Sequence, residues 1–557
     1  MLPHRSGLPS SSWLGHTSTS VLALAALATF TAPAPTSHAA PPSAGVARPP
    51  PAAANPFERD EPAAPTCRID ELVFAHLASL GIEPAHVCSD AVFVRRAYLD
   101  VIGTLPTAAA ARGFLADRRP DKRAILIDQL LARDEFADYW TMKWCDLLRV
   151  KAEFPVNLWP NAAQEYHRWI YTAIRDNLPY DQFVRTLLTA NGSNFRVGPV
   201  NFYRAIQGRS PEAIARAVAL TFLGARAEKW PAPELAGLSG FFSAVAYKPT
   251  QEWKEEIVYF DPAKVGANTD AVFPAWPAPS SSRPADAVRL SPDHDPRAVF
   301  ADWLIRPDNP WFTRAIVNRV WSWLLGRGII EPADDIRPDN PATNPELLAY
   351  LQQEFVAQHY DVKRLFRLML NSQTYQLSSI ARSPRPEAEA NFAFYAPRRL
   401  PAEVLIDALD QITGTTEEYS SAIPEPFTFI PESQRSIALP DGSITSTFLE
   451  MFGRPARDTG EERERNNAIS ATQELHLLNS THIQRKIQQG PKLQALLRAR
   501  RPAAEKITEL YLTILSRPPT ANERAAIAEY VKTSKGWIAG ADVAWALINS
   551  SEFLYRH

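Results

Sequence analysis

The chain has 557 residues, of which 45% are hydrophobic and 22% are charged, and this composition is that of a folded protein rather than a disordered one. A chain of this length is too long for one hydrophobic core, so we expect more than one domain. Its 61 acidic and 59 basic residues are interspersed and leave a formal net charge of −2. This balance gives no field that would favour nucleic acid or an anionic membrane as a partner.

The first 39 residues are typical of an export signal. Arg5 precedes the apolar run VLALAALATF (21–30), and the small residues of TSHAA follow it before the expected cleavage site. The apolar run is too short to span a bilayer comfortably. We therefore predict a signal peptide over 1–39, a Pro/Ala-rich tether over 40–66, and a periplasmic or cell-surface protein with no transmembrane span in its mature chain.

From residue 67 the sequence changes to amphipathic helical patterns joined by short turns. Several segments carry apolar residues at helical spacing: IDELVFAHLASLG (69–81), FVRRAYLDVIGTLPT (93–107), DKRAILIDQLLA (121–132) and PEAIARAVALTF (211–222). The best strand signal is EEIVYF (255–260). These patterns predict an N-terminal helical domain over 67–260.

Periodicity is lost over 261–296, where proline and serine cluster, and we expect a linker there. Helical patterns resume at RAVFADWLI and continue in groups to residue 555. They predict a C-terminal helical domain over 297–557. The fold class is therefore mainly α, with two helical domains and a few short strands in the connecting regions.

The three cysteines do not form any of the common cysteine motifs. Cys67 and Cys88 flank a predicted helix, and whether they form a disulfide stays open at this level. Cys145 lies among large apolar residues and is expected to be a buried small hydrophobe. No C-x-x-C occurs, which excludes zinc ribbons, thioredoxin chemistry and c-type haem attachment.

One candidate group lies on the predicted helix of 93–107. Arg95, Arg96 and Asp100 share this helix, and Arg96 and Asp100 are four residues apart, so they can pair on one face. An arginine cannot act as a base, and a salt-bridged aspartate is poorly placed to do so. The pattern favours a structural ion pair over a catalytic arrangement.

The most distinctive segment is NRVWSWLLGRGIIEPADDIRPDNPATNPELL, which begins in a helix that Gly326 can end. Its candidate interaction residues are Asn318, Arg319 and Trp321 on the helix and Asp334, Asp335 and Arg337 in the following loop. The acidic loop has two interpretations. The carboxylates can ligate a hard cation such as calcium, or they can form ion pairs that fix the loop, and the nearby arginine favours ion pairs.

Five histidines lie in helical context with no carboxylate or cysteine at ligand spacing, and we expect structural roles for them: His76, His167, His359, His476 and His482. The chain has no nucleophile elbow, zinc-protease, Walker or Rossmann motif. We therefore predict no catalytic residue, no metal ligand and no cofactor-binding residue. Most of the fourteen tryptophans lie at helical spacing beside leucine and isoleucine, so core packing is favoured over stacking on sugars.

Taken together, several long motifs resemble the planctomycete cytochrome-associated family, exported proteins with two tandem domains of unknown function. The motifs of the first half include AVFVRRAYLDVIGTLPT, FADYWTMKWCDLLRV and LPYDQFVRTLLTANGSNF. Those of the second half include DPRAVFADWLIRPDNPWFTRAIVNRVWSWLLGRGIIEPADD, LNSQTYQLSS and NSSEFLY. The resemblance spans about residues 68–556 and implies an exported protein without an assigned activity.

The resemblance also marks a segment where this chain departs from the family. Many members carry C-x-x-C-H after an FLG helix end, where two cysteines hold haem covalently and the histidine ligates its iron. Here Gly224 runs through ARAEK to Trp230, without cysteine or histidine. We therefore expect no covalent haem, and the absence of its ligands argues against an electron-transfer role.

Three hypotheses of function are compatible with these features. The favoured one is a non-catalytic binding or scaffolding protein that acts with a secreted partner, which the resemblance suggests is a sulfatase-like or phosphatase-like protein from a neighbouring gene. The second is an enzyme acting on extracellular polysaccharide, with Asp334 and Asp335 as acid and base. The third is a redox accessory protein that holds haem without covalent bonds.

Overall fold

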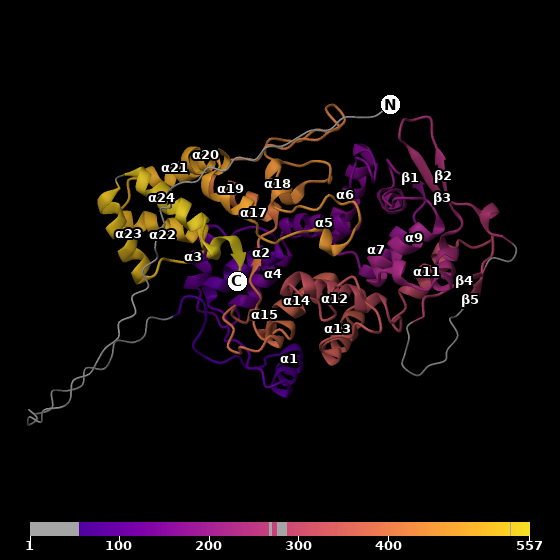
Figure 1. Cartoon of the computed structure of the whole chain (residues 1–557), viewed down its shortest axis with the longest axis horizontal. Coiled ribbons are helices and arrows are strands. Elements are labelled where there is room, and N and C mark those ends of the chain that lie inside the picture. The colour runs from indigo at the N-terminus through magenta and orange to yellow at the C-terminus, as the bar shows by residue number, and fades with distance from the viewer. Residues whose placement is uncertain (1–54, 267–269, 276–286, 535) are drawn as a thin grey trace, which may run out of the picture. The chain divides into compact units, whose positions relative to one another are not determined.

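The computed structural model describes residues 55–266, 270–275, 287–534 and 536–557. The predicted signal peptide and the first part of the predicted tether, residues 40–54, lie outside the described residues. Helices dominate, as predicted, and the strands form only small sheets (Figure 1). None of the helices described has the length and apolar character needed to cross a bilayer.

The described part of the first half contains ten α-helices: α1 (Arg68–Ser79), α2 (Asp90–Val101), α3 (Ala108–Ala116), α4 (Lys122–Leu131), α5 (Asp134–Leu147), α6 (Pro160–Arg175), α7 (Tyr180–Thr189), α8 (Asn201–Arg204), α9 (Pro211–Val218) and α10 (Ala232–Ser239). Local sequence explains their starts. The Ser210 hydroxyl accepts a hydrogen bond from the amide of Ala213, and Pro211 occupies the first helical position, where it has no hydrogen bond to lose. A π-helical turn, Ala219–Leu223, follows α9 and ends at Gly224.

The strands are short and form three small sheets among the described residues. Their bounds are β1 (Gly192–Ser193), β2 (Val245–Pro249), β3 (Glu256–Phe260), β4 (Asp270–Val272), β5 (Ala287–Arg289), β6 (Arg398–Arg399) and β7 (Tyr555–Arg556). The predicted strand at 255–260 is confirmed as β3, which pairs antiparallel with β2 in the register Tyr247–Val258. In the predicted linker, β4 pairs with β5.

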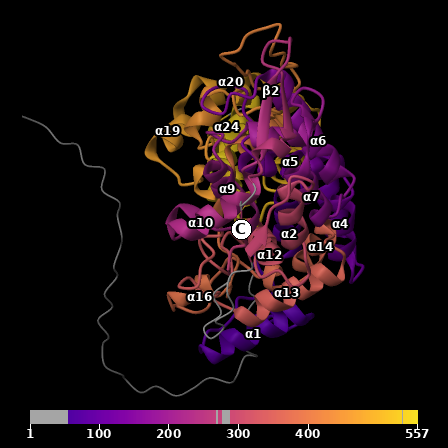
Figure 2. The ribbon, with the colours of Figure 1, turned by 90° about the vertical axis from the view of Figure 1, so that its right-hand side faces the viewer.

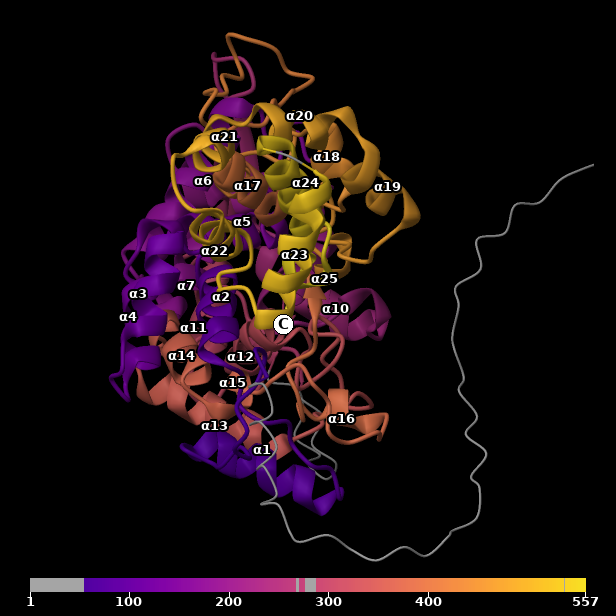
Figure 3. The ribbon, with the colours of Figure 1, turned by 90° about the vertical axis from the view of Figure 1, so that its left-hand side faces the viewer.

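The second half contains helices over two stretches. The first comprises α11 (Pro296–Leu304), α12 (Phe312–Leu325), α13 (Pro345–Ala357), α14 (Val362–Leu370), α15 (Gln373–Gln376), α16 (Glu387–Ala390), α17 (Ala402–Thr413) and α18 (Thr447–Met451). The second comprises α19 (Ala471–Asn479), α20 (Thr481–Gln489), α21 (Pro491–Arg498), α22 (Ala503–Ile514), α23 (Ala521–Thr533), α24 (Trp537–Ile548) and α25 (Ser551–Leu554). Figure 3 shows α20 to α24 gathered in one yellow group. The predicted helix end at Gly326 is confirmed, with φ 87° at that glycine.

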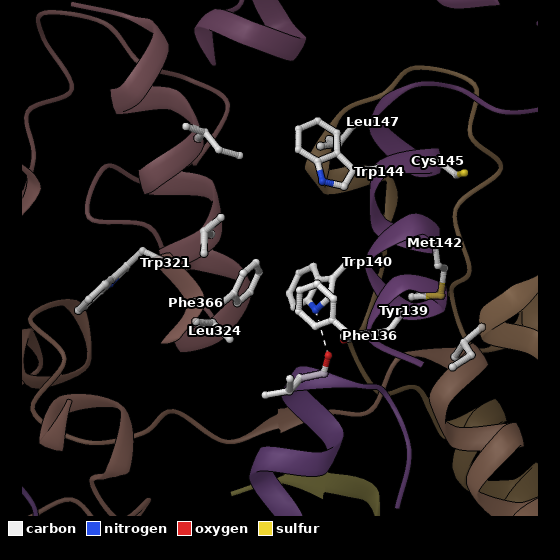
Figure 4. Packing of buried hydrophobic residues seen from close by; sticks show 14 of the residues in the cluster. Phe136, Tyr139, Trp140, Met142, Trp144, Cys145, Leu147, Trp321, Leu324 and Phe366 are labelled. Carbon is white, nitrogen blue, oxygen red and sulfur yellow. Dashed lines mark hydrogen bonds between the residues drawn. The ribbon is translucent and has the colours of Figure 1, made fainter. Parts of the chain in front are cut away.

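The hydrophobic core runs through both predicted domain spans. On α5, the Trp140 ring lies 4.4 Å from the ring of Phe366 on α14 and 5.2 Å from that of Trp323 on α12, measured between centroids. The Trp140 indole also donates to the carbonyl of Val101 at 3.0 Å (Figure 4). Residues Asn55–His557 form one compact unit. The two domain spans stay a prediction, but their core side chains pack together.

The three cysteines are free thiols in the structure, so Cys67 and Cys88 are not bonded to each other. Cys145 is fully buried in the aromatic core of α5, as expected (Figure 4). Burial raises the pKa of its thiol to about 12, which keeps it protonated and unreactive at neutral pH.

Candidate functional site

Arg95 and Arg96 on α2 are buried, and their guanidinium groups hold the backbone of distant segments. Nη1 of Arg95 donates to the carbonyl oxygen of Ile514 at 2.7 Å, and its Nη2 to that of Phe553 at 2.9 Å. Nη1 of Arg96 donates to the carbonyl oxygen of Tyr375 at 2.6 Å. Both arginines therefore tie α2 to the second half of the chain.

Asp100 takes its partners from elsewhere in the fold, which corrects the predicted pair with Arg96. Its Oδ1 accepts a hydrogen bond from Nη1 of Arg556 at 2.7 Å. Its Oδ2 accepts from the hydroxyls of Tyr375 at 3.0 Å and Tyr395 at 2.8 Å. A helical i,i+4 pair is worth only about 0.3–0.5 kcal/mol, so these buried partners outweigh it.

Asn318 and Trp321 on α12 serve packing rather than an open site. The Asn318 amide exchanges two hydrogen bonds with the backbone of Ile330, each 2.8 Å long, and so fixes the chain after the helix. The Trp321 side chain has no exposed surface, and its ring meets that of Phe392 edge-on at 5.2 Å. Neither side chain is available to a ligand in this arrangement.

Arg319 connects α12 to two other parts of the chain. Its Nη1 donates to the carbonyl oxygen of Thr221 at 2.8 Å, within the π-helical turn. Its Nε donates to Oε1 of Glu462 at 3.1 Å, an oxygen that also accepts from the Trp323 indole at 3.2 Å. The backbone amide of Glu462 in turn lies 3.3 Å from Oδ2 of Asp334. The structure therefore brings Arg319 and Asp334 together through Glu462.

The acidic loop after α12 meets the segment 224–230, in which we expected no covalent haem. Nη2 of Arg226 donates to Oδ1 of Asp334 at 2.8 Å, and both side chains are largely buried. Nζ of Lys229 lies 3.3 Å from both carboxylate oxygens of Asp335, which also accepts from Nε of Arg337 at 3.3 Å. Both carboxylates face cations of the chain itself. No group of side chains suited to hold a metal ion occurs among the described residues.

Gly224 allows these two segments to approach each other closely. Its carbonyl oxygen accepts a hydrogen bond from the amide of Ile336 at 2.8 Å. Its φ is 62°, in the left-handed region, and a Cβ added there would lie 2.9 Å from Cδ1 of Ile336. We call the contact surface of residues 220–229, 330–337 and Glu462 the seam. The left-handed backbone conformation favours glycine at this point, and a larger residue would also have to displace the end of the Ile336 side chain.

Sequence reasoning missed Glu462, which is part of the seam, and Lys143, which interacts electrostatically with it. Lys143 is on α5, and burial, with the positive charge of Arg465, lowers the pKa of its ammonium group well below its usual range. Burial also raises the pKa of Glu462, against the charge of Arg319. The one sequence signal was a lysine inside the mostly apolar run WTMKWCDLL. Glu462 carried no signal, because it lies in an irregular stretch.

A second layer of buried charge lies beyond Lys143. The Arg465 guanidinium contacts both Asp146, at 2.7 Å, and Glu403, at 2.7 Å. Arg457 pairs with Asp146 at 3.0 Å, and Arg454 lies 3.6 Å from Glu403. Each carboxylate therefore meets two guanidinium groups, as is required to keep such charges inside a protein.

Two histidines predicted to be isolated are in contact with each other and with a carboxylate. Nε2 of His476 lies 3.4 Å from Nδ1 of His482, whose Nε2 lies 3.0 Å from Glu417. Nζ of Lys486 lies 3.3 Å from the same carboxylate. The two histidines are six residues apart, and Ser480 separates the helices that carry them, α19 and α20. In one continuous helix, residues six apart would lie on different faces. This is why the sequence pattern missed the contact.

Two family models match the chain in tandem. Residues 68–227 match PSCyt2, a protein of unknown function (DUF1549), and residues 296–531 match PSD1, a protein of unknown function (DUF1553). No curated protein and no solved structure matches. The seam is formed by residues of both matched spans: Arg226 belongs to the first and Asp334 to the second. The chain therefore carries two tandem domains of unknown function, PSCyt2 followed by PSD1.

Proposed function

We propose that the chain is an exported, non-catalytic binding or scaffolding protein of the planctomycete cytochrome-associated type, and that it acts with a second exported protein. One observation carries the proposal. Where the family resemblance places a haem-attachment motif, this chain has Arg226 and Lys229, which are paired with Asp334 and Asp335. The side chains at this place bind another part of the same molecule, so the segment has a structural use.

The same geometry weakens the alternative of a polysaccharide-cleaving enzyme at this loop. A general acid must keep its proton near neutral pH, and a general base must reach the substrate. Asp334 is 1% exposed and Asp335 is 6% exposed, and each faces a basic side chain. Both carboxylates are buried and already paired with cations of the chain, so neither can reach a substrate as acid or base.

The partner is proposed to be the sulfatase-like or phosphatase-like product of a neighbouring gene. The test is to purify the full chain and this protein separately, mix them, and measure the mass of the eluting species by light scattering. We expect one complex of defined stoichiometry. Separate elution of the two proteins at micromolar concentration would contradict the proposal.

Absorption spectroscopy tests the remaining alternative, a redox protein with non-covalent haem. The full chain is mixed with free haem, desalted and scanned through the visible range. We expect no Soret band to elute with the protein. A stoichiometric Soret band would favour the redox function over the scaffold function.

A further inference from the structure

Three loops bring aromatic side chains together at the surface, far from the seam in sequence. Phe154 and Trp159 belong to the chain between α5 and α6, Trp253 to the β2–β3 hairpin, and Phe427 to the segment before α18. The Trp159 ring lies 4.5 Å from that of Trp253 and 5.3 Å from that of Phe427. Figure 2 shows the β2 hairpin at one end of the molecule, with an orange loop beside it. We call these four residues the aromatic rim.

The rim is exposed to an unusual degree. Phe154 is 84% exposed, Trp253 is 64% exposed and Phe427 is 48% exposed. Phe154 and Trp253 line a groove of about 690 Å³, together with other residues of the hairpin, of 154–157 and of 204–209. Large aromatic side chains normally bury most of their surface. A cluster of exposed aromatic rings beside a groove is therefore a candidate binding site.

The loops that carry the rim are held in place by buried polar contacts. The amide of Ala152 donates to Asp441 at 2.8 Å, and the amide of Glu153 donates to Ser443 at 2.9 Å. In the hairpin, the amide of Glu256 donates to the Asn194 side chain at 2.8 Å. The rings are therefore presented on a braced backbone, which lowers the entropy lost when a ligand binds.

The groove carries balanced charge. Its basic residues are Arg204, Arg209 and Lys254, and its acidic residues are Glu252, Glu255 and Glu256. Glu256 pairs with Arg204 at 2.7 Å and with Arg209 at 2.9 Å. An anionic ligand would have to compete with these carboxylates. The arrangement suits an uncharged ligand that both donates and accepts hydrogen bonds.

We propose that the groove binds a neutral polysaccharide, whose sugar rings stack on Trp253 and Phe154. The flat C–H face of a pyranose matches an exposed aromatic ring, and its hydroxyls match exposed amides such as those of Asn157 and Gln251. The exposed large hydrophobic side chains that line the groove, Phe154 and Trp253, are both aromatic, and the aliphatic lining residues Val156 and Ile206 are buried. This favours a sugar chain over a protein surface. The proposal rests on the proposed binding function and names a ligand for it.

The test uses the full chain on an array of neutral and anionic polysaccharides, followed by calorimetric titration with a soluble form of any that bind. We expect binding to one or more neutral polysaccharides. Trp253→Ala should weaken that binding about tenfold, which is the order expected for one lost stacking ring. Trp537→Ala is the matched control, because Trp537 is 39% exposed and lies on α24, away from the groove. It should leave the affinity unchanged.

Three results would overturn this proposal: binding to anionic polysaccharides alone, binding to none, or equal affinity for the Trp253→Ala variant. An unchanged urea midpoint shows that each variant remains folded. Binding of the exported partner distinguishes a failure of this proposal from a failure of the proposed function. If the partner complex forms with both the original chain and Trp253→Ala while no neutral polysaccharide binds, the polysaccharide assignment fails and the scaffold function stands.

Discussion

Glu403 lies on α17 with no exposed surface, and its two oxygens accept hydrogen bonds from Arg465 at 2.9 and 2.7 Å. Glu403→Gln removes the charge while keeping the shape, and leaves Arg454 and Arg465 with less compensation inside the protein. Removing one partner of a buried pair costs about 3–5 kcal/mol, so we expect a loss of about 3 kcal/mol in the free energy of unfolding. Urea denaturation measures it.

The exposed pair of Arg68 and Glu71 provides the control for this variant. Their side chains are 55% and 54% exposed, so Glu71→Gln should change the free energy of unfolding by less than about 0.5 kcal/mol. Equal effects of Glu403→Gln and Glu71→Gln would contradict the structural role given to the buried charge.

The same carboxylate should make stability depend on pH. Burial by itself raises the pKa of Glu403, but the charges of Arg465 and Arg454 and the hydrogen bonds from Arg465 outweigh it and lower the pKa to about 2. The unfolded chain has its glutamate pKa at about 4.3 and so binds more protons below that value. The stabilisation is complete above about pH 4.3 and is lost as pH falls towards 2. The stability difference between the original chain and Glu403→Gln should shrink over that interval.

Lys143 gives a prediction of opposite sign. Because burial lowers its pKa, the folded chain binds fewer protons than the unfolded one between the lowered pKa and about 10.4. Keeping the lysine charged therefore destabilises the fold at neutral pH. We expect Lys143→Met to raise the free energy of unfolding at pH 7 by roughly 1–2 kcal/mol, a figure reduced for partial exposure, with the gain vanishing above about pH 10.4. A loss of stability at pH 7 would show that Lys143 is a structural partner of Glu462.

At this scale the sequence predicted which residues were unusual better than it predicted their partners. The i,i+4 spacing indicated a pair for Asp100, and the partners are Arg556 and two tyrosines from far along the chain. Spacing along a helix reports only local neighbours. Partners hundreds of residues away have no signal in a single sequence.

At the scale of elements, Gly224 ends the π-helical turn and forms a hydrogen bond with the loop after α12. Gly224→Ala places a Cβ in a left-handed conformation and 2.9 Å from Cδ1 of Ile336. The conformational penalty is about 1–2 kcal/mol, and the contact adds to it, so we expect a loss of about 2 kcal/mol in the free energy of unfolding. Thermal or urea denaturation checks this value.

Gly113 is the matched control for that substitution. It lies in α3, and an added Cβ would meet nothing within 4 Å. Gly113→Ala should therefore stabilise the protein by about 0.5–1 kcal/mol, through helix propensity alone. A similar loss for both variants would mean that the seam does not require glycine at 224.

Elements with strong periodicity or clear end signals could be predicted from the sequence. The helix that ends at Gly326 and the strand at 255–260 are examples. The acidic loop and the segment 224–230 could each be singled out, but their contact could not be predicted. It depends on how the π-helical turn and α12 pack. Amphipathic patterns show that a face is buried, and they do not show which element covers it.

At the scale of the whole molecule, the buried groups of each predicted domain span are satisfied by the other. Arg95 and Arg96 of the first span donate to backbone oxygens of the second, and Asp100 pairs with Arg556. Separated from the second span, the first would leave these three charges without their partners. An uncompensated buried charge costs several kcal/mol, and a domain is stable by only about 5–15 kcal/mol.

We therefore expect that residues 55–260 and 296–557, expressed separately, do not fold independently, although two family models match them one at a time. Each fragment should lack a cooperative unfolding transition, and co-expression should restore one complex with a single transition. Calorimetry and size-exclusion chromatography measure both properties, with the full chain as reference. If each fragment unfolds cooperatively by itself, the two matched spans are autonomous domains, and the shared core and the seam are an interface between them.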